Sequence, residues 1–252
     1  MIKKKILITG CAGFIGFHTS EYFIKKNIKV FGCDNLNDFY DVNLKKDRLK
    51  ILKKHIKNFD FYKIDLQNSK KLEKIIYNNK IKTVIHLAAQ AGVRDSISYP
   101  KKYFDNNVIV FFNILEVCRK FNVDLIYASS SSVYGEKKPM VENNRANPIQ
   151  FYAATKKTNE TMASVYSKLY DFNSIGLRFF TVYGPYGRPD MSYYKFSKKI
   201  FQNKKIEIYN KFNHSRDFTY ISDVTNLIFK CYLKIKKSKN IDNQIYNVGR
   251  GE

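Results

Sequence analysis

Short apolar runs alternate with longer amphipathic stretches along most of the chain. Runs rich in β-branched and aromatic residues, typical of buried strands, lie at 2–9, 28–33, 59–64, 81–87, 123–128 and 175–180. The spacing of apolar positions between them predicts helices up to about residue 26, over 42–57, over 100–121 and around 152–156, with another beginning near residue 69. This alternation predicts an α/β fold, in which a mostly parallel sheet is covered by helices on both faces.

Shorter elements follow residue 180. The pattern predicts helices at 193–203 and 224–235, and strands at 206–209, 216–221 and 245–248. A loop punctuated by Gly and Pro, at 181–190, separates them from the sixth strand. Because the later elements can return to the sheet, the predicted boundary near residue 180 is soft.

A glycine-rich turn joins the first predicted strand to the first predicted helix. Its spacing is G-x-x-G-x-x-G, a variant of the commoner G-x-G-x-x-G. Glycines at such a turn let the backbone approach a pyrophosphate, and the N-terminus of the helix directs free N–H groups toward it. The residues predicted to bind a cofactor here are Gly10, Gly13, Phe14, Ile15 and Gly16.

The second predicted strand leads to Asp34, which is followed by Asn35. A Rossmann unit places at about this position the carboxylate that accepts the adenosine ribose hydroxyls. An acidic residue there favours NAD over NADP, because its charge would repel a 2′-phosphate. We therefore predict a Rossmann-type, doubly wound NAD-binding domain over residues 1–180, and a smaller C-terminal substrate lobe with returning sheet elements over residues 181–252.

Further candidates follow the third and fourth strands. After the third strand come Asp65 and Leu66, where a carboxylate either meets the adenine amino group or caps the next helix. His86 is interpreted as a buried core histidine, and Arg94 either pairs with an anion or has a surface or capping role. Small residues such as Ala88 and Ala89 after the fourth strand suit a close approach of the backbone to a cofactor. The cofactor candidates at this strand end are Leu87, Ala88, Ala89 and Gln90.

Consecutive serines, from Ser129 to Ser132, follow the fifth strand, at the edge where open α/β sheets bind ligands. Further along the chain, Tyr152 and Lys156 lie about one helical turn apart. A cation beside a phenol favours the phenolate, which makes Tyr152 a candidate general base. The same Tyr/Lys spacing recurs elsewhere in the chain, so the serine run, the glycine turn and Asp34 are what single this pair out.

Basic residues outnumber acidic ones, and the formal net charge is +23. The lysines are spread as short pairs on predicted helix faces, without an arginine-rich run or a nucleic-acid-binding signature, so we expect no nucleic-acid partner. Attraction of an anionic small ligand is compatible with this charge. The scattered cysteines indicate neither a metal site nor a disulfide framework. With no apolar run long enough for a signal peptide or a membrane span, we expect a soluble cytoplasmic protein.

Together these motifs resemble the extended short-chain dehydrogenase/reductase family, and within it the nucleotide-sugar 4-epimerases. The segments at 9–16, 86–90, 130–135 and 152–156 follow the family order and spacing. Those at 34–41, 91–94, 177–185 and 187–190 resemble the UDP-glucuronate 4-epimerases. The resemblance implies NAD that stays bound, a UDP-sugar substrate and, as in many members, a homodimer.

The resemblance also implies roles for individual residues. Tyr152 would remove the proton of the sugar 4-hydroxyl, with Lys156 favouring its phenolate and Ser130 sharing the proton, while hydride passes from C4 to NAD⁺ and later returns to the other face. Arg216 resembles the family arginine that meets the UDP diphosphate or the uridine ribose. Arg188 either holds a sugar carboxylate or closes its Pro-flanked loop. The expected substrate contacts are Ser129, Ser130, Ser131, Thr181, Arg188, Arg216 and Arg94.

Several alternatives stay open within and beyond this family. The 4,6-dehydratases carry an Asp-Glu pair where this chain has Ser131 and Ser132, and related decarboxylases usually carry an acidic residue in this run, so both reactions are disfavoured. A UDP-glucose/UDP-galactose 4-epimerase and a non-catalytic NAD-binding Rossmann protein remain as alternatives. Family members usually extend well beyond the position of Glu252, so we expect the substrate lobe to be partial, as in a truncated chain.

Overall fold

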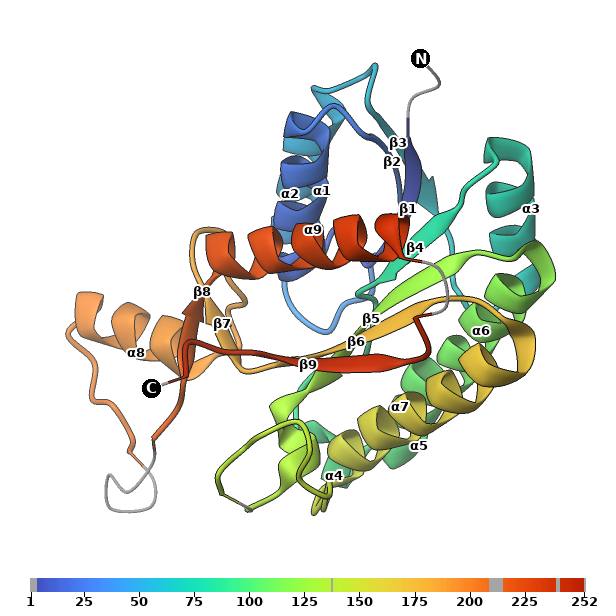
Figure 1. Cartoon of the computed structure of the whole chain (residues 1–252). Coiled ribbons are helices and arrows are strands. Elements are labelled where there is room, and N and C mark those ends of the chain that lie inside the picture. Colours follow the sequence, from blue (N-terminus) through green and yellow to red (C-terminus); the bar gives the residue numbers. More distant parts are fainter. Residues whose placement is uncertain (1–3, 137, 209–214, 239–240, 252) are drawn as a thin grey trace.

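A parallel sheet forms the centre of the molecule (Figure 1). The computed structural model describes residues 4–136, 138–208, 215–238 and 241–251, and within them seven strands follow the order β3-β2-β1-β4-β5-β6-β9. These are β1 (Lys5–Thr9), β2 (Lys29–Asp34), β3 (Phe59–Lys63), β4 (Thr83–His86), β5 (Asp124–Ser130), β6 (Ser174–Phe179) and β9 (Gln244–Val248). The chain winds outward from β1 in both directions, which confirms the predicted doubly wound α/β fold.

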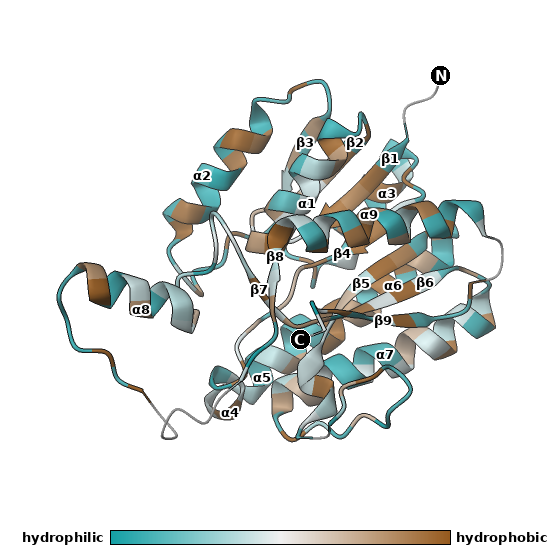
Figure 2. Ribbon diagram, turned by 60° about the vertical axis from the view of Figure 1, so that its left-hand side comes forward, coloured by the Kyte–Doolittle hydropathy of each residue, from teal (hydrophilic) through white to brown (hydrophobic). Residues whose placement is uncertain are grey.

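Helices cover both faces of the sheet (Figure 1). One face carries α1 (Phe14–Lys25), α2 (Val42–Lys53) and α9 (Ile221–Lys237), and the other carries α3 (Ser69–Asn79), α6 (Val110–Phe121) and α7 (Phe151–Tyr170). Side chains alternate across a strand, so Ile6 and Ile8 of β1 join one apolar cluster while Leu7 joins the other. Burial on both faces explains why the central strands read as continuous apolar runs, and Figure 2 shows β1 largely in hydrophobic brown.

The long helix predicted at 100–121 is built from three segments. They are α5 (Pro100–Tyr103), the π-helical η1 (Phe104–Ile109) and α6, and the short α4 (Asp95–Ser98) precedes them. Single π-helical turns inside α-helices are frequent at functional sites. The π-helical turn contains the buried Asn107, whose side chain reaches toward the end of β4.

Residues after 180 divide between the central sheet and a small lobe. β9 pairs with β6 in register from Ile175 with Gln244 to Phe179 with Val248, and α9 packs on α1. In the part of the chain that the structure describes, β7 (Thr181–Tyr183) and β8 (Phe218–Tyr220) form a separate two-stranded sheet, and α8 (Ser192–Phe201) lies in the same lobe (Figure 1). A division at residue 180 therefore stays a proposal, since the chain leaves the sheet there and re-enters it at β9.

Some predicted elements differ from the observed ones. The strand predicted at 206–209 is wrong for 206–208, which form no secondary structure, and Tyr209 lies outside the described residues, as does Ile2 of the first predicted strand. Ile208 is 47% exposed and Ile206 is only partly buried, so little burial favours an extended strand here. The helix predicted at 42–57 ends at Lys53, and only Phe218–Tyr220 of the segment 216–221 is a strand.

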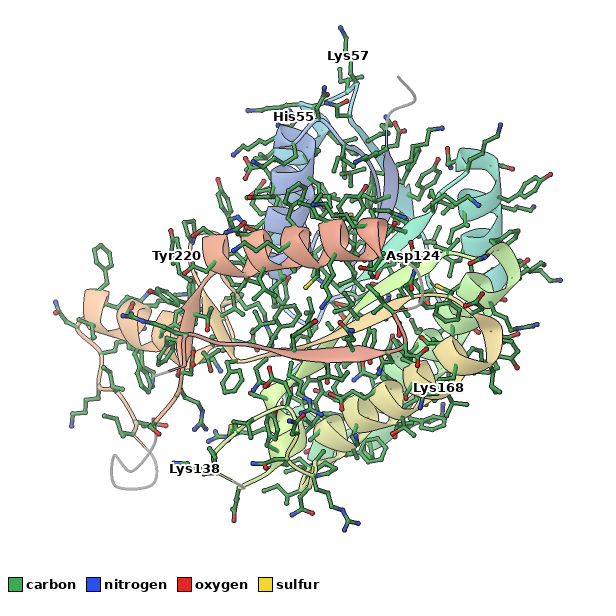
Figure 3. All side chains as sticks on the ribbon, in the orientation of Figure 1. His55, Lys57, Asp124, Lys138, Lys168 and Tyr220 are labelled. Carbon is green, nitrogen blue, oxygen red and sulfur yellow. The ribbon has the colours of Figure 1, made fainter. Side chains whose placement is uncertain are left out.

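Charged side chains lie mostly on the outside, and Figure 3 shows Lys57 and Lys168 projecting from the ribbon. Lys45 and Lys156 differ, because they are only 5% and 2% exposed. His86 is also buried, shares a hydrogen bond of 2.8 Å with the Thr9 hydroxyl, and has a pKa lowered by burial to about 3, as expected of a core histidine. Across the described ranges, no helix has both the length and the apolar character needed to cross a membrane.

Candidate active site

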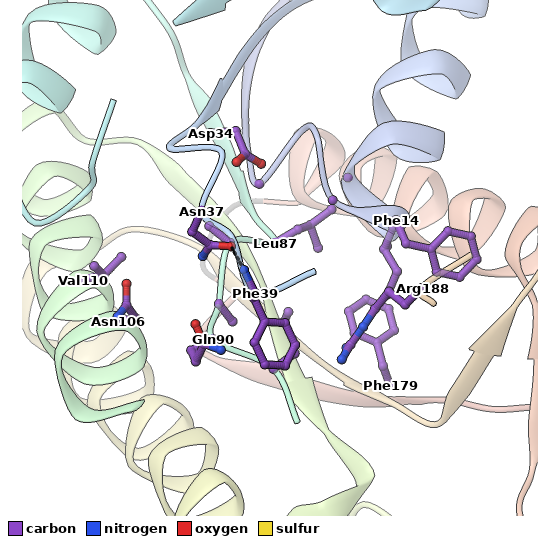
Figure 4. Close-up of a pocket in the computed structure, with 18 of the residues that line it drawn as sticks. Phe14, Asp34, Asn37, Phe39, Leu87, Gln90, Asn106, Val110, Phe179 and Arg188 are labelled. Atoms are coloured by element: carbon purple, nitrogen blue, oxygen red, sulfur yellow. Dashed lines mark hydrogen bonds between the residues drawn. The ribbon is translucent and has the colours of Figure 1, made fainter. Parts of the chain in front are cut away.

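A cavity of about 270 Å³ lies at the carboxyl ends of the sheet strands (Figure 4). It occupies the point where the strand order reverses between β1 and β4, which is where open α/β sheets bind ligands. Every residue predicted for cofactor binding or catalysis lines it, and the set is Gly10, Gly13, Phe14, Ile15, Gly16, Asp34, Asn35, Asp65, Leu66, Leu87, Ala88, Ala89, Gln90, Ser130, Tyr152 and Lys156. Segments far apart in sequence thus meet at one site.

The glycine turn has a backbone that larger residues could not adopt. Gly10 has a φ of +68°, in the left-handed region that favours glycine, and its carbonyl accepts a hydrogen bond of 2.9 Å from the N–H of Gly13. A Cβ atom on Gly16 would lie only 2.0 Å from the carbonyl oxygen of Gly10. The close packing of turn and helix brings the N-terminus of α1, with its partial positive charge, to the cavity wall.

Two carboxylates are held at the opposite end of the cavity from the catalytic candidates. Asp34 accepts hydrogen bonds from the N–H of Ala12 at 3.1 Å and of Leu36 at 2.8 Å, which orient the carboxylate and leave lone pairs free for ribose hydroxyls. Asp65 accepts the N–H of Gln67 at 2.9 Å. The cap of α3 is Asn68, so Asp65 is not the helix cap that was the alternative reading of this residue.

Gln90 is a further feature that fits a polar cofactor. Its Oε1 atom is buried and has no hydrogen-bond partner among the described residues. Its backbone is fixed by Asn107, which accepts the N–H at 2.8 Å and donates to the carbonyl at 3.1 Å. Because Gln90 lines the cavity, N–H or O–H donors of a ligand could satisfy this acceptor. Together with the glycine turn and Asp34, it fits a dinucleotide such as NAD.

Tyr152 and its neighbours form the reactive end of the cavity. Burial raises the pKa of the Tyr152 phenol above its usual value, and the positive charge of Arg188 and a hydrogen bond with Ser130 oppose this shift without reversing it. Lys156 donates to the carbonyl of Ala128 at 3.0 Å, and its Nζ lies 5.9 Å from the centre of the Tyr152 ring. Burial lowers the pKa of Lys156 to about 8. Two cations thus lie near the phenol, Arg188 and Lys156, and the role of Lys156 in favouring the phenolate stays a prediction.

Arg188 enters the cavity from the loop after β7. Its Nε and Nη2 atoms bind Asp190 at 3.0 and 2.5 Å, so the guanidinium is held in a fixed plane. Its Cζ lies 5.8 Å from the ring centre of Phe39, and Figure 4 shows the two side chains projecting into the cavity. This pair lies within the Pro-flanked loop, so it is compatible both with closing that loop and with holding a sugar carboxylate, and the second role stays a prediction.

Other predicted substrate residues lie outside this cavity. The residues that do not line it are Ser131, Thr181, Arg94 and Arg216. Ser131 begins the 3-10 turn η2 (Ser131–Tyr134), and Thr181 begins β7 with its N–H bound to the carbonyl of Asp217. Ser129 lines the cavity, but its hydroxyl donates to Glu160 at 2.7 Å. Contact of these residues with a substrate stays a prediction.

Several cavity residues were not predicted from the sequence. They come mainly from the loop after β2, from α2, from η1 and α6, and from the end of β6, and include Asn37, Phe39, Tyr40, Lys45, Asn106, Val110, Phe179, Phe180, Val182 and Met191. Lys45 is the clearest example, because its ammonium donates to the carbonyl and side-chain oxygens of Asn37 at 2.7 and 2.6 Å. A Lys-rich amphipathic helix reads as solvated, so no sequence signal marks this lysine as buried.

Comparisons with known proteins agree with this fold and cavity. Residues 6–249 match the model of the NAD dependent epimerase/dehydratase family. The chain is 51% identical to protein CapI of Staphylococcus aureus, over 91% of this chain and 70% of that protein. It is 44% identical to the UDP-glucuronate 4-epimerase of Thermodesulfobacterium geofontis, over 98% and 75% of the two chains.

A solved structure is similar along nearly the whole chain. It is the UDP-glucuronic acid 4-epimerase of Bacillus cereus in complex with UDP-glucuronic acid and NAD, with a TM-score of 0.90 and 35% identity, covering 97% of this chain and 77% of that one. Sequence and three-dimensional likeness thus agree with the doubly wound sheet and its cavity. The chain belongs to the NAD dependent epimerase/dehydratase family, as its motifs predicted.

Proposed function

We propose that this protein is an NAD-dependent UDP-glucuronate 4-epimerase, which interconverts UDP-glucuronate and UDP-galacturonate by transient oxidation at C4. The similarity to proteins of that name, one of them solved with UDP-glucuronic acid and NAD, supports the substrate. The observation that carries the proposal is the presence of Arg188 beside Tyr152 in one cavity. This pairing supplies a cation for a sugar carboxylate next to a phenol that can exchange a proton.

The cofactor half of the cavity suits NAD. The glycine turn and the N-terminus of α1 would hold the pyrophosphate, and Asp34 would hold the adenosine ribose. Asp65 and the buried Oε1 of Gln90 add further polar contacts. When bound, NAD supplies the hydride acceptor and donor for the sugar C4.

Proton transfer at the sugar 4-oxygen is assigned to Tyr152. Arg188 and Ser130 oppose the effect of burial on the phenol, which brings its pKa closer to neutrality than burial alone would allow. Ser130 shares the proton through its hydroxyl. Lys156 donates to the carbonyl of Ala128 in β5, lines the cavity beside Tyr152, and would favour its phenolate.

Retention of the sugar carboxylate is the particular difficulty of this substrate. Oxidation at C4 of a uronic acid gives a β-keto acid that is prone to lose CO₂. A guanidinium that holds the carboxylate opposes this loss, and Arg188 is oriented for it by Asp190. We propose hydroxyl contacts from Ser129, Ser130, Ser131 and Thr181, and diphosphate binding by Arg216, while Arg94 is exposed and the least suited of the predicted contacts.

Location and assembly are further parts of the proposal. The four cysteines, all within the described residues, are buried free thiols, which supports a reducing cytoplasm. Exposed apolar side chains on α6 and α7, namely Phe112, Val165 and Leu169, support a homodimer through these helices.

The test is incubation of the purified protein with UDP-glucuronate, followed by proton NMR of the anomeric region. We expect UDP-galacturonate to accumulate to a constant ratio from either direction without added oxidant. Parallel incubation with UDP-glucose tests the alternative epimerase. A folded, NAD-loaded protein that converts neither uronate rules the proposal out, and conversion of UDP-glucose in preference would replace it by that alternative.

A further inference from the structure

Arg48 of α2 is a buried cation without an acidic partner. Its side chain is 0% exposed, and no carboxylate of the described residues forms an ion pair with it. Its Nε atom is buried and has no hydrogen-bond partner within the described ranges. Burying a guanidinium is unfavourable unless its donors are satisfied. The acceptors that the other guanidinium nitrogens of Arg48 bind therefore indicate the role of this residue.

The two terminal nitrogens of Arg48 bind two segments that are far apart in the sequence. Nη1 donates to the carbonyl of Ala12 at 2.8 Å and to the hydroxyl of Tyr40 at 2.7 Å. Nη2 donates to the carbonyl of Tyr186 at 2.6 Å and, at 3.4 Å, to that of Gly187. Ala12 belongs to the glycine turn, and Tyr186 and Gly187 directly precede Arg188. One side chain thus connects the cofactor turn to the loop that carries the substrate arginine.

That loop needs external support. Tyr186 has a φ of +55°, a left-handed backbone that is unfavourable for a residue with a large side chain. Besides Arg48, further contacts from the cofactor side include a hydrogen bond of 2.8 Å between His18 and the carbonyl of Pro185, and the ring of Phe17 at 5.4 Å from that of Tyr186. All three residues come from α1 and α2, so the loop is positioned by the cofactor-binding half of the fold.

The glycine turn does not depend on Arg48 in the same way. Its backbone is closed by hydrogen bonds from Gly13 to Gly10 at 2.9 Å and from Gly10 to Cys33 at 2.8 Å. Arg48 touches it only through the carbonyl of Ala12, whereas a pyrophosphate is bound by N–H groups. Loss of Arg48 should therefore release the loop 184–190 and leave the cofactor turn formed.

We propose that Arg48 is a positioning residue for the substrate, which fixes the loop 184–190 to the glycine turn and thereby holds Arg188 in the cavity. The proposal rests on the proposed function in one respect, that Arg188 binds the sugar carboxylate. Arg48 then acts on substrate binding through Arg188, and has no direct contact with the sugar.

Steady-state kinetics with UDP-glucuronate test this role. In Arg48→Met we expect the KM to rise about tenfold or more, because loss of one charge-assisted hydrogen bond corresponds to a factor of this size. The kcat should change less, and the content of bound NAD should stay the same. Arg48→Lys, which keeps a charge and some donors, should recover part of the KM. Lys50→Met, on the exposed face of α2, is the control for a change in this helix, because its side chain is 77% exposed.

A double-mutant cycle separates positioning from general loss of structure. If Arg48 acts through Arg188, adding Arg48→Met to Arg188→Gln should raise the KM no further than Arg188→Gln alone. Additive effects, or loss of NAD in proportion to the rise in KM, would overturn the proposal. If Arg48→Met does not fold, the same cycle is carried out with Arg48→Lys.

Hydrogen exchange gives a readout that does not depend on activity. With NAD present, the amides of residues 184–191 should exchange about tenfold faster in the Arg48 variants, while those at the start of α1 stay protected. Unchanged exchange in 184–191 contradicts the positioning role whether or not the protein is an epimerase. If exchange is faster in the Arg48 variants but the wild type converts no UDP-glucuronate, the connection between loop and turn is retained and only the proposed substrate is rejected.

Discussion

Arg178 and Glu160 form a buried bidentate ion pair near the carboxyl end of β6, with Nε to Oε1 at 2.8 Å and Nη2 to Oε2 at 2.9 Å. Their side chains are 4% and 2% exposed. Burial raises the pKa of Glu160, but hydrogen bonds from Arg178 and Ser129 outweigh this effect and hold the pKa below its usual value. Because Ser129 lines the cavity and donates a hydrogen bond to Glu160, the ion pair fixes one residue of the cavity wall.

Replacing Glu160 by Gln should destabilise the fold strongly. The change leaves the Arg178 guanidinium buried without its counter-charge, so we expect the free energy of unfolding in urea at pH 7.5 to fall by about 3 kcal/mol. The pKa of Glu160 is lowered in the folded state, so the advantage of the wild type is fully present above the unfolded pKa of about 4.3 and is lost as the pH falls further. An advantage that persists unchanged at pH 3 would contradict this account.

Glu21→Gln provides the matched control for that substitution. Glu21 pairs with Lys25 one turn away on α1 at 3.1 Å, and these side chains are 26% and 65% exposed. An exposed pair of this kind contributes at most about 0.5 kcal/mol, so the same measurement should show little change. Equal effects of the two substitutions would mean that burial of the Arg178–Glu160 pair is not what matters.

Replacing Tyr152 by Phe tests the proton transfer. The aromatic ring and its packing remain, and only the hydroxyl that faces Ser130 and Arg188 is lost, so kcat for UDP-glucuronate should fall by about 10²–10⁴-fold. The NAD content of the purified protein, measured by absorbance after denaturation, should equal that of the wild type. Tyr166→Phe, further along α7, removes a hydroxyl bound to Glu116 of α6 and should leave kcat unchanged. Full turnover in Tyr152→Phe would exclude it as the base.

Because of Lys156, the free energy of unfolding should rise with pH in the alkaline range. Burial lowers the pKa of Lys156 to about 8, below the unfolded value of about 10.4. The free energy of unfolding is therefore highest above the unfolded pKa, where the amine is neutral in both states, and this stability is lost as the pH falls through the folded pKa. Between pH 8 and pH 9.5 the wild type should therefore gain about 1.5 kcal/mol of unfolding free energy relative to Lys156→Met, which cannot titrate there. Parallel curves for the two proteins would mean that Lys156 keeps an ordinary pKa.

The sequence predicted the sheet well because its strands are buried on both faces and read as continuous apolar runs. It also located the glycine turn and Asp34, since their chemistry depends on residues that are close in sequence. It did not predict that Arg188 would lie beside Tyr152, because that proximity depends on how a late loop packs on α1 and α2. It also treated α2 as a solvated helix, although Lys45 and Arg48 are buried. A charged side chain gives no local signal of the partners that make its burial possible.

Asp34 should decide the choice of cofactor. In Asp34→Asn one backbone N–H loses its acceptor and the negative charge disappears, so we expect NAD to bind about tenfold more weakly and the preference for NAD over NADP to shrink. Calorimetric titration of cofactor-free protein measures both affinities, and thermal unfolding checks that the variant is folded. Asp60→Asn on the neighbouring strand is the control, because Asp60 pairs with Lys29 at 2.8 Å outside the cavity. If Asp34→Asn still rejects NADP as strongly as Asp60→Asn does, another residue of the cavity repels the 2′-phosphate, and the assignment of the ribose site to Asp34 is wrong.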